Sequence, residues 1–591
     1  MIQTANKYRI SEIFGIDTRI KYIVPKYQRE YIWGKEQWEN LFNDLSDSDE
    51  EHFIGSIICV NKGTDALKPI LEIIDGQQRL TTISILYAAI YDRFLKESRD
   101  DEYFITEKNN LKRRLIQSHC EDELKLELSY QNNNFEDYRF ILTEIGLHKV
   151  TNKPHNWGNR RICKAYRYFK ENLSDLDYDQ IIKVLYRVNS ALLVKIEVDN
   201  HSDAFTLFET LNNRGIPLYA IDLIKNNILS ELEKKNIKSI DDAFDGWKKL
   251  VDNLPDYPIQ ERFLRQYYNA FKYDEKIKIE GAHRATRGNL IKIYERLIYQ
   301  DPEFIFDELV EKSKVYNLFV EPEDGESDGE YYRGLTDLLH IGAAPSYTFL
   351  LYLFAEHENN TKLIGDSINF LVKYFVRRNL TDFPSTRDLD AIFIGLVDEC
   401  ERNRDNLTSS FVINYLTYPG RFADLNTFKE KLEGDIYEDN VAATRFILCK
   451  IEEEHQTKEI HTNLWARGKN KKFVWTIEHI FPEGKNIPGK WVDMVANGDK
   501  NEANELQMRW VHKLGNLTMT GYNPNLSNLS FEEKRDRKNN RGVYIGYRNG
   551  LYLNDELASK NSWTTEDIKS RTDKLVMKAL ELFGIDNEKI D

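Results

Sequence analysis

Apolar and polar positions alternate differently in successive parts of the chain. Short apolar runs at 53–60 and 70–74, rich in β-branched residues and followed by turn residues, predict two strands. A longer run at 81–94 is apolar nearly all round, which predicts a buried helix. A further run at 191–198 predicts another strand of the same sheet. The first region is therefore expected to be α/β.

The middle of the chain has helical spacing instead. From about 241 to 458, apolar residues recur every three or four positions, which predicts a helical bundle. One acidic, glycine-containing stretch at 321–330 is expected to be a solvated loop within it. We therefore predict a predominantly helical α+β fold with domains at 1–235, 236–458 and 459–591.

Composition places the chain of 591 residues among ordinary globular proteins, because 41% of it is apolar and it has only 14 Pro and 29 Gly. No stretch approaches the roughly 20 apolar residues that cross a bilayer, and no secretory signal is present, so we expect a cytoplasmic protein without a membrane partner. Five scattered cysteines indicate neither disulfides nor a thiolate zinc site. The formal charge of −15 repels nucleic acid, so any DNA binding requires basic groups gathered locally.

The third region holds the residue types that phosphodiester hydrolysis needs, which are a base for water, ligands for a hard cation and groups that fix both. Glu478 stands beside His479 at the end of an apolar run. Adjacent side chains of a strand point oppositely, so both reach one centre only through a bend, which Pro482 favours. A lone histidine is more often structural, and the Asn-Pro-Asn sequence at 523–525 is more often a simple turn.

A second candidate site lies at the junction between the predicted strand at 70–74 and the helix that follows, where the sequence reads Asp-Gly-Gln-Gln-Arg. Unpaired N–H groups at a helix start attract anions, Gly76 permits close approach, and Arg79 offers a fork for phosphate. There is no Walker-type loop in the chain. A turn with a helix cap explains the bare motif about equally well.

Taken together, residues of about 466–545 resemble the His-Asn-Asn variant of the HNH, or ββα-metal, nuclease domain of GmrSD-type modification-dependent restriction enzymes. The motifs that match are 478–482, 514–518, Asn523, 526–528 and Lys534. The resemblance implies that His479 is the general base and that Asn516 steadies both the β-hairpin and that base. It also implies that Glu478 and Asn523 ligate a divalent cation, for which Mg²⁺ suits a neutral Asn ligand.

At this end of the chain Asn528, Lys534 and Arg535 are the candidates for contacting DNA. Lys534 and Arg535 lie on a predicted helical run at 531–541, which also carries further basic residues. A solvated basic helix explains these two residues almost as well as a phosphate contact does.

Residues of about 8–230 resemble the ParB-like domain at the amino end of the same family. The segments that match are 27–33, 53–55, 75–79, 208–215 and 222–226. Family members use this domain to bind, and often to hydrolyse, a nucleoside triphosphate. The residues that the resemblance implies for nucleotide binding are Asp75, Gly76, Gln77, Gln78, Arg79, Asn212, Arg214 and Lys225.

Some relatives sense modified DNA through the amino-terminal region. Tyr27, Tyr31 and Trp33 would form an aromatic recognition surface, because aromatic rings stack on bases or cover apolar substituents. Gln28 and Arg29 are the polar candidates beside them. Core packing is the alternative for at least one of the aromatic residues.

We therefore expect a single-chain antiphage restriction endonuclease, regulated by a nucleoside triphosphate, that cuts modified phage DNA with one divalent metal. The alternative is a nucleotide-dependent switch or DNA-binding module whose nuclease domain is inactive or depends on a partner. A nuclease that acts on RNA or nicks one strand is a third possibility. Residue types leave open the DNA modification, the nucleotide, the role of its hydrolysis, the role of the helical middle and a possible homodimer.

Overall fold

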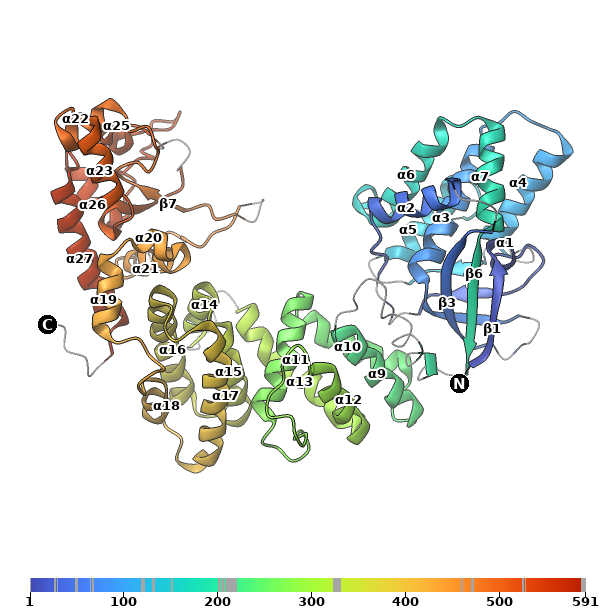
Figure 1. The fold of residues 1–591 in the computed structure, drawn as a ribbon, viewed down its shortest axis with the longest axis horizontal. Helices are drawn as coiled ribbons and strands as arrows, with labels where there is room; N and C mark the ends of the chain where they lie inside the picture. Colours follow the sequence, from blue (N-terminus) through green and yellow to red (C-terminus); the bar gives the residue numbers. More distant parts are fainter. Residues whose placement is uncertain are drawn as a thin grey trace. The chain divides into compact units, whose positions relative to one another are not determined.

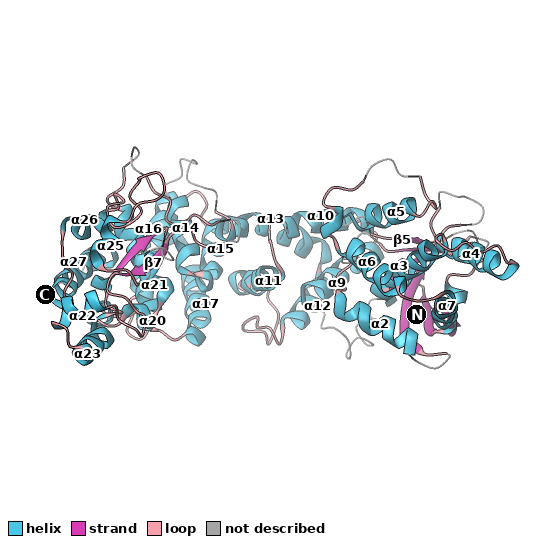
Figure 2. Cartoon of the chain, turned by 90° about the horizontal axis from the view of Figure 1, so that it is seen from above, coloured by secondary structure: helices cyan, strands magenta, loops and turns pink. Residues whose placement is uncertain are grey.

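A computed structural model describes most of the chain in two compact units, Met1–Asp252 with Gly288–Val310, and Asn253–Arg287 with Glu311–Asp591. Helices predominate in both units, and the strands are few (Figures 1 and 2). The residues outside the description are 1, 26–27, 29, 48–50, 64, 66–67, 118–122, 130–132, 150–152, 200–202, 205–206, 208–219, 323–330, 458, 460, 469–471, 523–525, 527 and 586–591. Within the described part, no helix has the length and apolar character needed to span a bilayer.

The first unit is built on a six-stranded sheet of order β1-β6-β3-β4-β2-β5. Its strands are β1 (Ile2–Arg9), β2 (Lys21–Ile23), β3 (Phe53–Asn61), β4 (Ile70–Asp75), β5 (Leu126–Glu127) and β6 (Leu192–Val198). Strand β6 runs parallel to β3 and antiparallel to β1, so the predicted strand at 191–198 does complete the first sheet. The predicted strands at 53–60 and 70–74 are confirmed as β3 and β4.

The other described elements of the first unit are helices. They include α1 (Ile10–Ile13), α2 (Lys35–Asp47), α3 (Gln77–Phe94), α4 (Glu102–Leu115), α5 (Asn134–Glu144), α6 (Arg161–Ser174), α7 (Tyr178–Ser190), α9 (Ala220–Lys234), α10 (Ile240–Asp252) and α12 (Leu290–Gln300). Helix α9 packs against α10 and α12. Helix α3 is buried along almost its whole length, as its apolar sequence predicts, and it packs against α4, α6 and α7. It follows β4 after a single residue, Gly76, so the end of one core strand directly positions the start of the central helix.

The second unit begins with the helical middle of the chain. Its helices there are α11 (Tyr257–Phe271), the later part of α13 (Pro302–Val320), α14 (Tyr332–Ile341), α15 (Tyr347–Glu356), α16 (Thr361–Thr381), α17 (Thr386–Arg402), α18 (Ser409–Leu416), α19 (Leu425–Glu433), α20 (Ile436–Asp439) and α21 (Val441–Glu453). The prediction of a helical middle is thus confirmed. The predicted acidic loop falls mostly outside the described residues.

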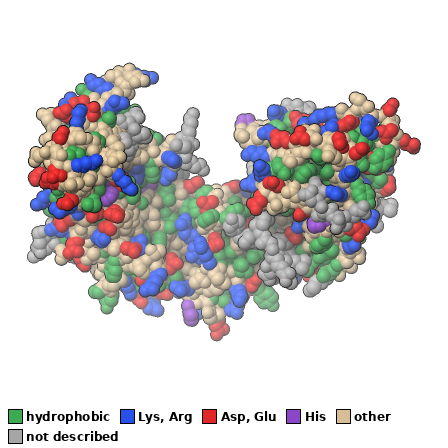
Figure 3. Space-filling model, turned by 45° about the horizontal axis from the view of Figure 1, so that its top comes forward, with side chains coloured by type: hydrophobic (Ala, Val, Ile, Leu, Met, Phe, Trp, Pro, Cys, Tyr) green, Lys and Arg blue, Asp and Glu red, His purple; other side chains and the backbone are tan. Residues whose placement is uncertain are grey.

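Beyond α21, the described residues of the second unit form a two-stranded antiparallel sheet and five helices. These elements are β7 (Thr476–His479), α22 (Gly489–Ala496), α23 (Lys500–Trp510), β8 (Leu517–Thr520), α25 (Phe531–Asp536), α26 (Tyr552–Ser559) and α27 (Thr565–Phe583). Their core centres on Trp491, Phe531 and Trp563, with the last two rings stacked at 5.9 Å between centroids. On the face drawn in Figure 3, acidic and basic side chains are interspersed over both units.

The predicted helical run at 531–541 is correct only for its first part. Helix α25 ends at Asp536, and the residues that follow turn back on themselves, with Lys538 bridged to Tyr544. The side chain of Asn539 accepts hydrogen bonds from the backbone N–H groups of Arg541 and Val543, which fixes a turn in place of helix.

Candidate active site

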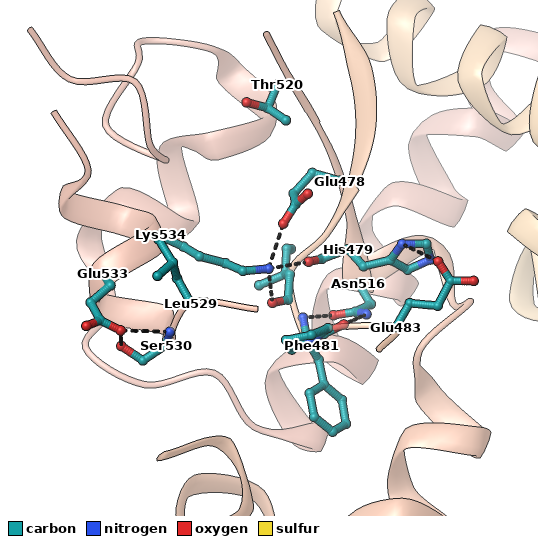
Figure 4. A network of polar contacts seen from close by, with 12 residues as sticks. Glu478, His479, Phe481, Glu483, Asn516, Thr520, Leu529, Ser530, Glu533 and Lys534 are labelled. Atoms are coloured by element: carbon teal, nitrogen blue, oxygen red, sulfur yellow. Dashed lines mark hydrogen bonds and ion pairs between the residues drawn. The ribbon is translucent and has the colours of Figure 1, made fainter. Parts of the chain in front are cut away.

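The hairpin of β7 and β8 places the two residues that head the carboxy-terminal motif. Its register pairs Glu478 with Thr518 and His479 with Leu517. In Figure 4 the carboxylate of Glu478 points toward Lys534, whereas the imidazole of His479 points away, toward Glu483. The alternation of a strand therefore persists to its last residue, and the structure does not bring the Glu478 and His479 side chains to one centre.

His479 lies in an almost closed aromatic setting and is 8% exposed. Its ring meets Tyr437 edge-on, with centroids 4.6 Å apart, and meets His512 edge-on at 5.4 Å. Burial, assisted by the neighbouring His512 and Lys534, lowers the pKa of His479 to about 3. The imidazole is therefore neutral at neutral pH, which is the form that accepts a proton.

The two ring nitrogens of His479 have different surroundings. Nε2 is buried and has no hydrogen-bond partner among the described residues. Nδ1 lies 3.6 Å from Oε2 of Glu483, a residue whose side chain is half exposed. A carboxylate on one nitrogen of a histidine orients the ring and leaves the other nitrogen for the proton transfer.

Asn516 lies at the base of the same hairpin and is completely buried. Its Oδ1 accepts a hydrogen bond from the Phe481 N–H at 2.8 Å, and its Nδ2 donates to the Phe481 and Val511 carbonyls at 3.0 and 2.9 Å. Its own carbonyl accepts from the Ile480 N–H at 2.9 Å. The bonds to Ile480 and Phe481 join the chain just after His479 to the start of β8, so the geometry agrees with a residue that steadies the hairpin.

Lys534, which we expected to contact DNA, lies in the interior of the protein. It is 0% exposed, and its ammonium donates to Glu478 Oε1 at 2.6 Å and to the His479 and Ile480 carbonyls at 2.8 and 3.2 Å (Figure 4). Burial lowers the pKa of Lys534 and raises that of Glu478, and each charge counters the shift of the other. The pattern of basic residues predicted a charge on this helix but not which side of the helix faces the core.

The other two candidates for DNA contact differ from each other. Arg535 is held by the protein, since its guanidinium donates to the Lys560 carbonyl at 2.6 Å and to Asn561 Oδ1 at 2.7 Å. Asn528 is exposed and lies beside Gly484, at the turn after β7. Asn523, the predicted catalytic and metal-ligating amide, lies outside the described residues.

Glu478, one of the two predicted magnesium ligands, has its carboxylate engaged within the protein. The Glu478 carboxylate is 3% exposed and already compensated by the Lys534 ammonium, whose charge repels a metal ion. Among the residues that are described, no three His, Cys, Asp or Glu side chains lie together as a metal site. Of the predicted pair, only Asn523 keeps that role open.

At the amino-terminal site, β4 ends at Asp75 and α3 begins at Gln77, which confirms the predicted strand-to-helix junction. Gly76 between them has φ +88°, and a Cβ added there would lie 2.5 Å from Cγ2 of Ile57. Both the backbone conformation and the close packing therefore require glycine. The Arg79 side chain, one turn into the helix, donates to the Ser56 carbonyl at 2.9 Å.

The two glutamines of the junction hold the preceding segment. Gln78 accepts hydrogen bonds from the Ile32 and Trp33 N–H groups at 2.9 and 3.3 Å and donates to the Glu30 carbonyl at 2.9 Å. Gln77 donates to Gln28 at 3.2 Å, and Gln28 donates in turn to the Ile74 carbonyl at 2.9 Å. The structure thus brings the two predicted motifs of this region together, although through contacts within the protein.

The aromatic residues predicted to recognise DNA occupy different environments. Tyr31 is a core residue, 4% exposed, and its hydroxyl is bonded to Thr82 and Trp38. Trp33 is half-buried against the same core. Core packing, the stated alternative, therefore describes Tyr31.

Of the remaining predicted residues of this region, the structure describes Lys225. Lys225, on α9, is 8% exposed and lies 3.6 Å from Asp222. Tyr27, Arg29, Asn212 and Arg214 fall outside the described residues.

Tyr437 and Glu483 are residues near His479 that the sequence did not indicate. Tyr437 belongs to α20, about forty positions before His479, and only tertiary packing brings the two rings together. Glu483 follows Pro482 directly and looked like an ordinary surface acid.

Two family models match the chain. One describes the N-terminal domain of the GmrSD restriction endonuclease and matches residues 10–229, which include the β4–α3 junction. The other describes the C-terminal domain of GmrSD restriction endonucleases and matches residues 422–578, which include the β7–β8 hairpin and α25. A comparison with curated proteins finds no match for the chain. Because both of its candidate sites lie within these matches, we conclude that the chain belongs to the GmrSD restriction endonuclease family.

Proposed function

We propose that this restriction endonuclease cleaves the phosphodiester bonds of modified phage DNA with His479 as its general base. We also propose that a nucleoside triphosphate bound near the β4–α3 junction regulates the enzyme. A divalent cation, for which we propose Mg²⁺, takes part in cleavage.

One observation carries the base assignment. The Nε2 atom of His479 is a buried nitrogen without a hydrogen-bond partner among the described residues. An orphaned acceptor of this kind is costly unless a water molecule or a substrate satisfies it, so its persistence indicates use. The Glu483 carboxylate, 3.6 Å from Nδ1, favours the tautomer with its proton on Nδ1, which leaves Nε2 to take a proton from water.

The proposal that a divalent cation takes part rests on one residue. When bound, a divalent ion neutralises negative charge on the phosphate. Asn523 is the residue we propose to hold it, because Glu478 is committed to Lys534. No step at His479 is assigned to the ion.

The nucleotide proposal has its support in the main chain of the junction. An α-helix begins with N–H groups that have no partner within the helix, and α3 begins at Gln77, directly after the core strand β4 and Gly76. Gln77 and Gln78 contribute by holding the segment before the junction, and Arg79 is the cation nearest to these N–H groups along the chain.

Cleavage by His479→Ala is the direct test of the base. With DNA carrying different modifications, Mg²⁺ and nucleotide, the wild type should cut, and the variant should be slower by about a hundredfold or more. His283→Ala, which changes an exposed histidine, is the matched control. If His479→Ala cuts at the wild-type rate, the base assignment is wrong.

A second candidate function has one observation in its favour. The ion pair with Lys534 engages the Glu478 carboxylate, which was predicted to be a metal ligand. A nuclease domain that needs a partner, or that has become a binding module, would lack such a ligand. This reading predicts that the wild type alone binds DNA but cuts no modified or plain substrate under any nucleotide condition.

A further inference from the structure

Residues 537–545, which we call the basic hairpin, form an ordered projection after α25. The Ile545 N–H donates to the Arg537 carbonyl at 2.9 Å, and the Asn539 N–H donates to the Val543 carbonyl at 2.9 Å. The Asn539 side chain closes the turn, and Gly542 adopts φ +79° in it. The hairpin is therefore a defined structural element and not a solvated helix end.

The basic hairpin carries a cluster of exposed positive charges. Arg537, Lys538 and Arg541 are all exposed, and none of them forms an ion pair with a carboxylate of the described residues. Val543, at the tip, is 59% exposed. Such a cluster is the local concentration of basic groups that binding to a polyanion requires.

The return strand of the hairpin brings a further basic residue, Arg548, close to this cluster of positive charges. Lys538 lies over the Tyr544 ring, 4.3 Å from its centroid, and Arg548 lies 5.8 Å from the same ring. Hydrogen bonds from Arg548 and then Lys538 lower the pKa of the Tyr544 phenol. Asp536, the acid at the start of the hairpin, is engaged by Arg548 at 3.2 Å.

The hairpin is rigidly joined to the candidate active site. A Cβ added at Gly546 would lie 1.9 Å from the Lys534 carbonyl oxygen, so the return strand packs directly on the backbone of α25. Lys534 in turn is bonded to Glu478 and to the His479 carbonyl (Figure 4). Arg537 is three residues beyond Lys534, so their Cα atoms are within about 11 Å of each other.

We propose that the basic hairpin docks on the phosphate backbone of duplex DNA and sets the position of the DNA relative to His479. The proposal rests on the proposed function, because it takes the His479 site as the place of cleavage. Its occupant is the DNA substrate that a restriction endonuclease acts on, chosen for charge complementarity. Side chains that contact phosphate give affinity and position without reading sequence, so the hairpin would act on plain and modified DNA alike.

The test measures binding separately from cleavage. In full-length His479→Ala protein, the triple variant Arg537→Gln, Lys538→Gln, Arg541→Gln is compared with its parent for binding to a short DNA duplex over a series of salt concentrations. Loss of three phosphate contacts should weaken binding by about tenfold or more at low salt and reduce the slope of log K against log salt by about 3.

A matched triple variant controls for total charge. Lys362→Gln, Arg387→Gln, Arg402→Gln removes the same charge from exposed positions at α16 and α17 and should leave the salt slope close to that of the parent. Equal slopes for the two triple variants would overturn the proposal, as would a loss of binding to RNA or to an acidic protein with DNA binding intact. Circular dichroism and thermal melting establish that both triple variants are folded.

The two proposals fail in different measurements. If His479→Ala protein cuts DNA like the wild type, the base assignment fails, whereas the salt slopes still decide the role of the hairpin. With His479 intact, the hairpin variant should raise KM more than it lowers kcat, because the base itself is unchanged. A fall in kcat alone, without any change in DNA binding, would contradict phosphate docking.

Discussion

The ammonium nitrogen of Lys534 lies 2.6 Å from the Glu478 carboxylate, and both side chains are almost completely inaccessible to solvent. The same ammonium also donates to the carbonyl of His479. This ion pair therefore links α25 to the last residues of β7, the strand that carries the proposed base. Its first consequence concerns stability.

We predict that Lys534→Met destabilises the second unit by about 3–5 kcal/mol, because it leaves the Glu478 charge buried and unpaired. The double variant Glu478→Gln with Lys534→Met should recover a large part of that loss, since no charge then remains in the interior. Urea denaturation followed by tryptophan fluorescence measures both. Additive effects of the two single substitutions would show that the pair is not coupled in the folded protein.

The second prediction concerns Glu483, whose Oε2 lies 3.6 Å from Nδ1 of His479. Glu483→Ala should lower kcat by roughly tenfold or more while leaving the affinity for DNA unchanged, because the imidazole loses the group that orients it. Glu483→Gln, which keeps a side-chain oxygen that can face Nδ1, should retain part of the activity. In a His479→Ala background, Glu483→Ala should have no further effect, and an additional loss there would assign Glu483 a different role.

Much of this architecture could be predicted from local pattern. Strands β3, β4 and β6 and helix α3 were predicted from continuous apolar runs, and many of the residues in these runs are buried. Strand β1 was not predicted. Its sequence is polar and its residues are mostly exposed, and its place in the sheet comes from backbone pairing with β6. Strands β2 and β5 are too short for any periodicity to show.

The candidate site was predictable in residue types but not in geometry. The resemblance to the nuclease family pointed to His479 and Asn516, and the structure places both residues at the same hairpin. The sequence did not indicate that Lys534 points into the core. A buried charge needs a partner of opposite charge, and that partner, Glu478, is brought near only by the tertiary fold. The end of α25 could have been predicted from the sequence, because Asn539 and Gly542 are residues typical of turns.

The third prediction concerns the β4–α3 junction. Gly76→Ala meets two obstacles, a φ of +88° and contact with Ile57 Cγ2 at 2.5 Å. Gly146→Ala is the matched control, because Gly146 has φ +73° but nothing within 4 Å of an added Cβ. We expect Gly146→Ala to cost about 1 kcal/mol from backbone strain alone, and Gly76→Ala to cost clearly more.

Nucleotide binding distinguishes the structural from the functional part of that effect. Titration with a labelled triphosphate should show weakened binding by Gly76→Ala at a temperature where the variant is still folded, and unchanged binding by Gly146→Ala. If neither variant alters nucleotide affinity, the phosphates do not lie at this junction.

The last prediction is a dependence of stability on pH through His340. Its ring is stacked on Trp465, with centroids 3.9 Å apart and planes at 13°, and burial lowers the pKa of His340 to about 4. In the unfolded chain the pKa of a histidine is about 6.5, so between these values the unfolded state binds the extra proton. The contribution of neutral His340 to stability is therefore fully present above about pH 6.5 and is lost as the pH falls toward 4, at no more than about 1.4 kcal/mol per pH unit.

His340→Phe keeps an aromatic ring against Trp465 and removes the titrating group. Thermal melting between pH 4 and 6.5 should then depend on pH less steeply than in the wild type, and the two curves should converge toward neutral pH, apart from a constant offset. His283→Phe, at an exposed position, supplies the control for a lost histidine. Parallel curves for the wild type and His340→Phe would mean that the pKa of His340 is the same in the folded and unfolded protein.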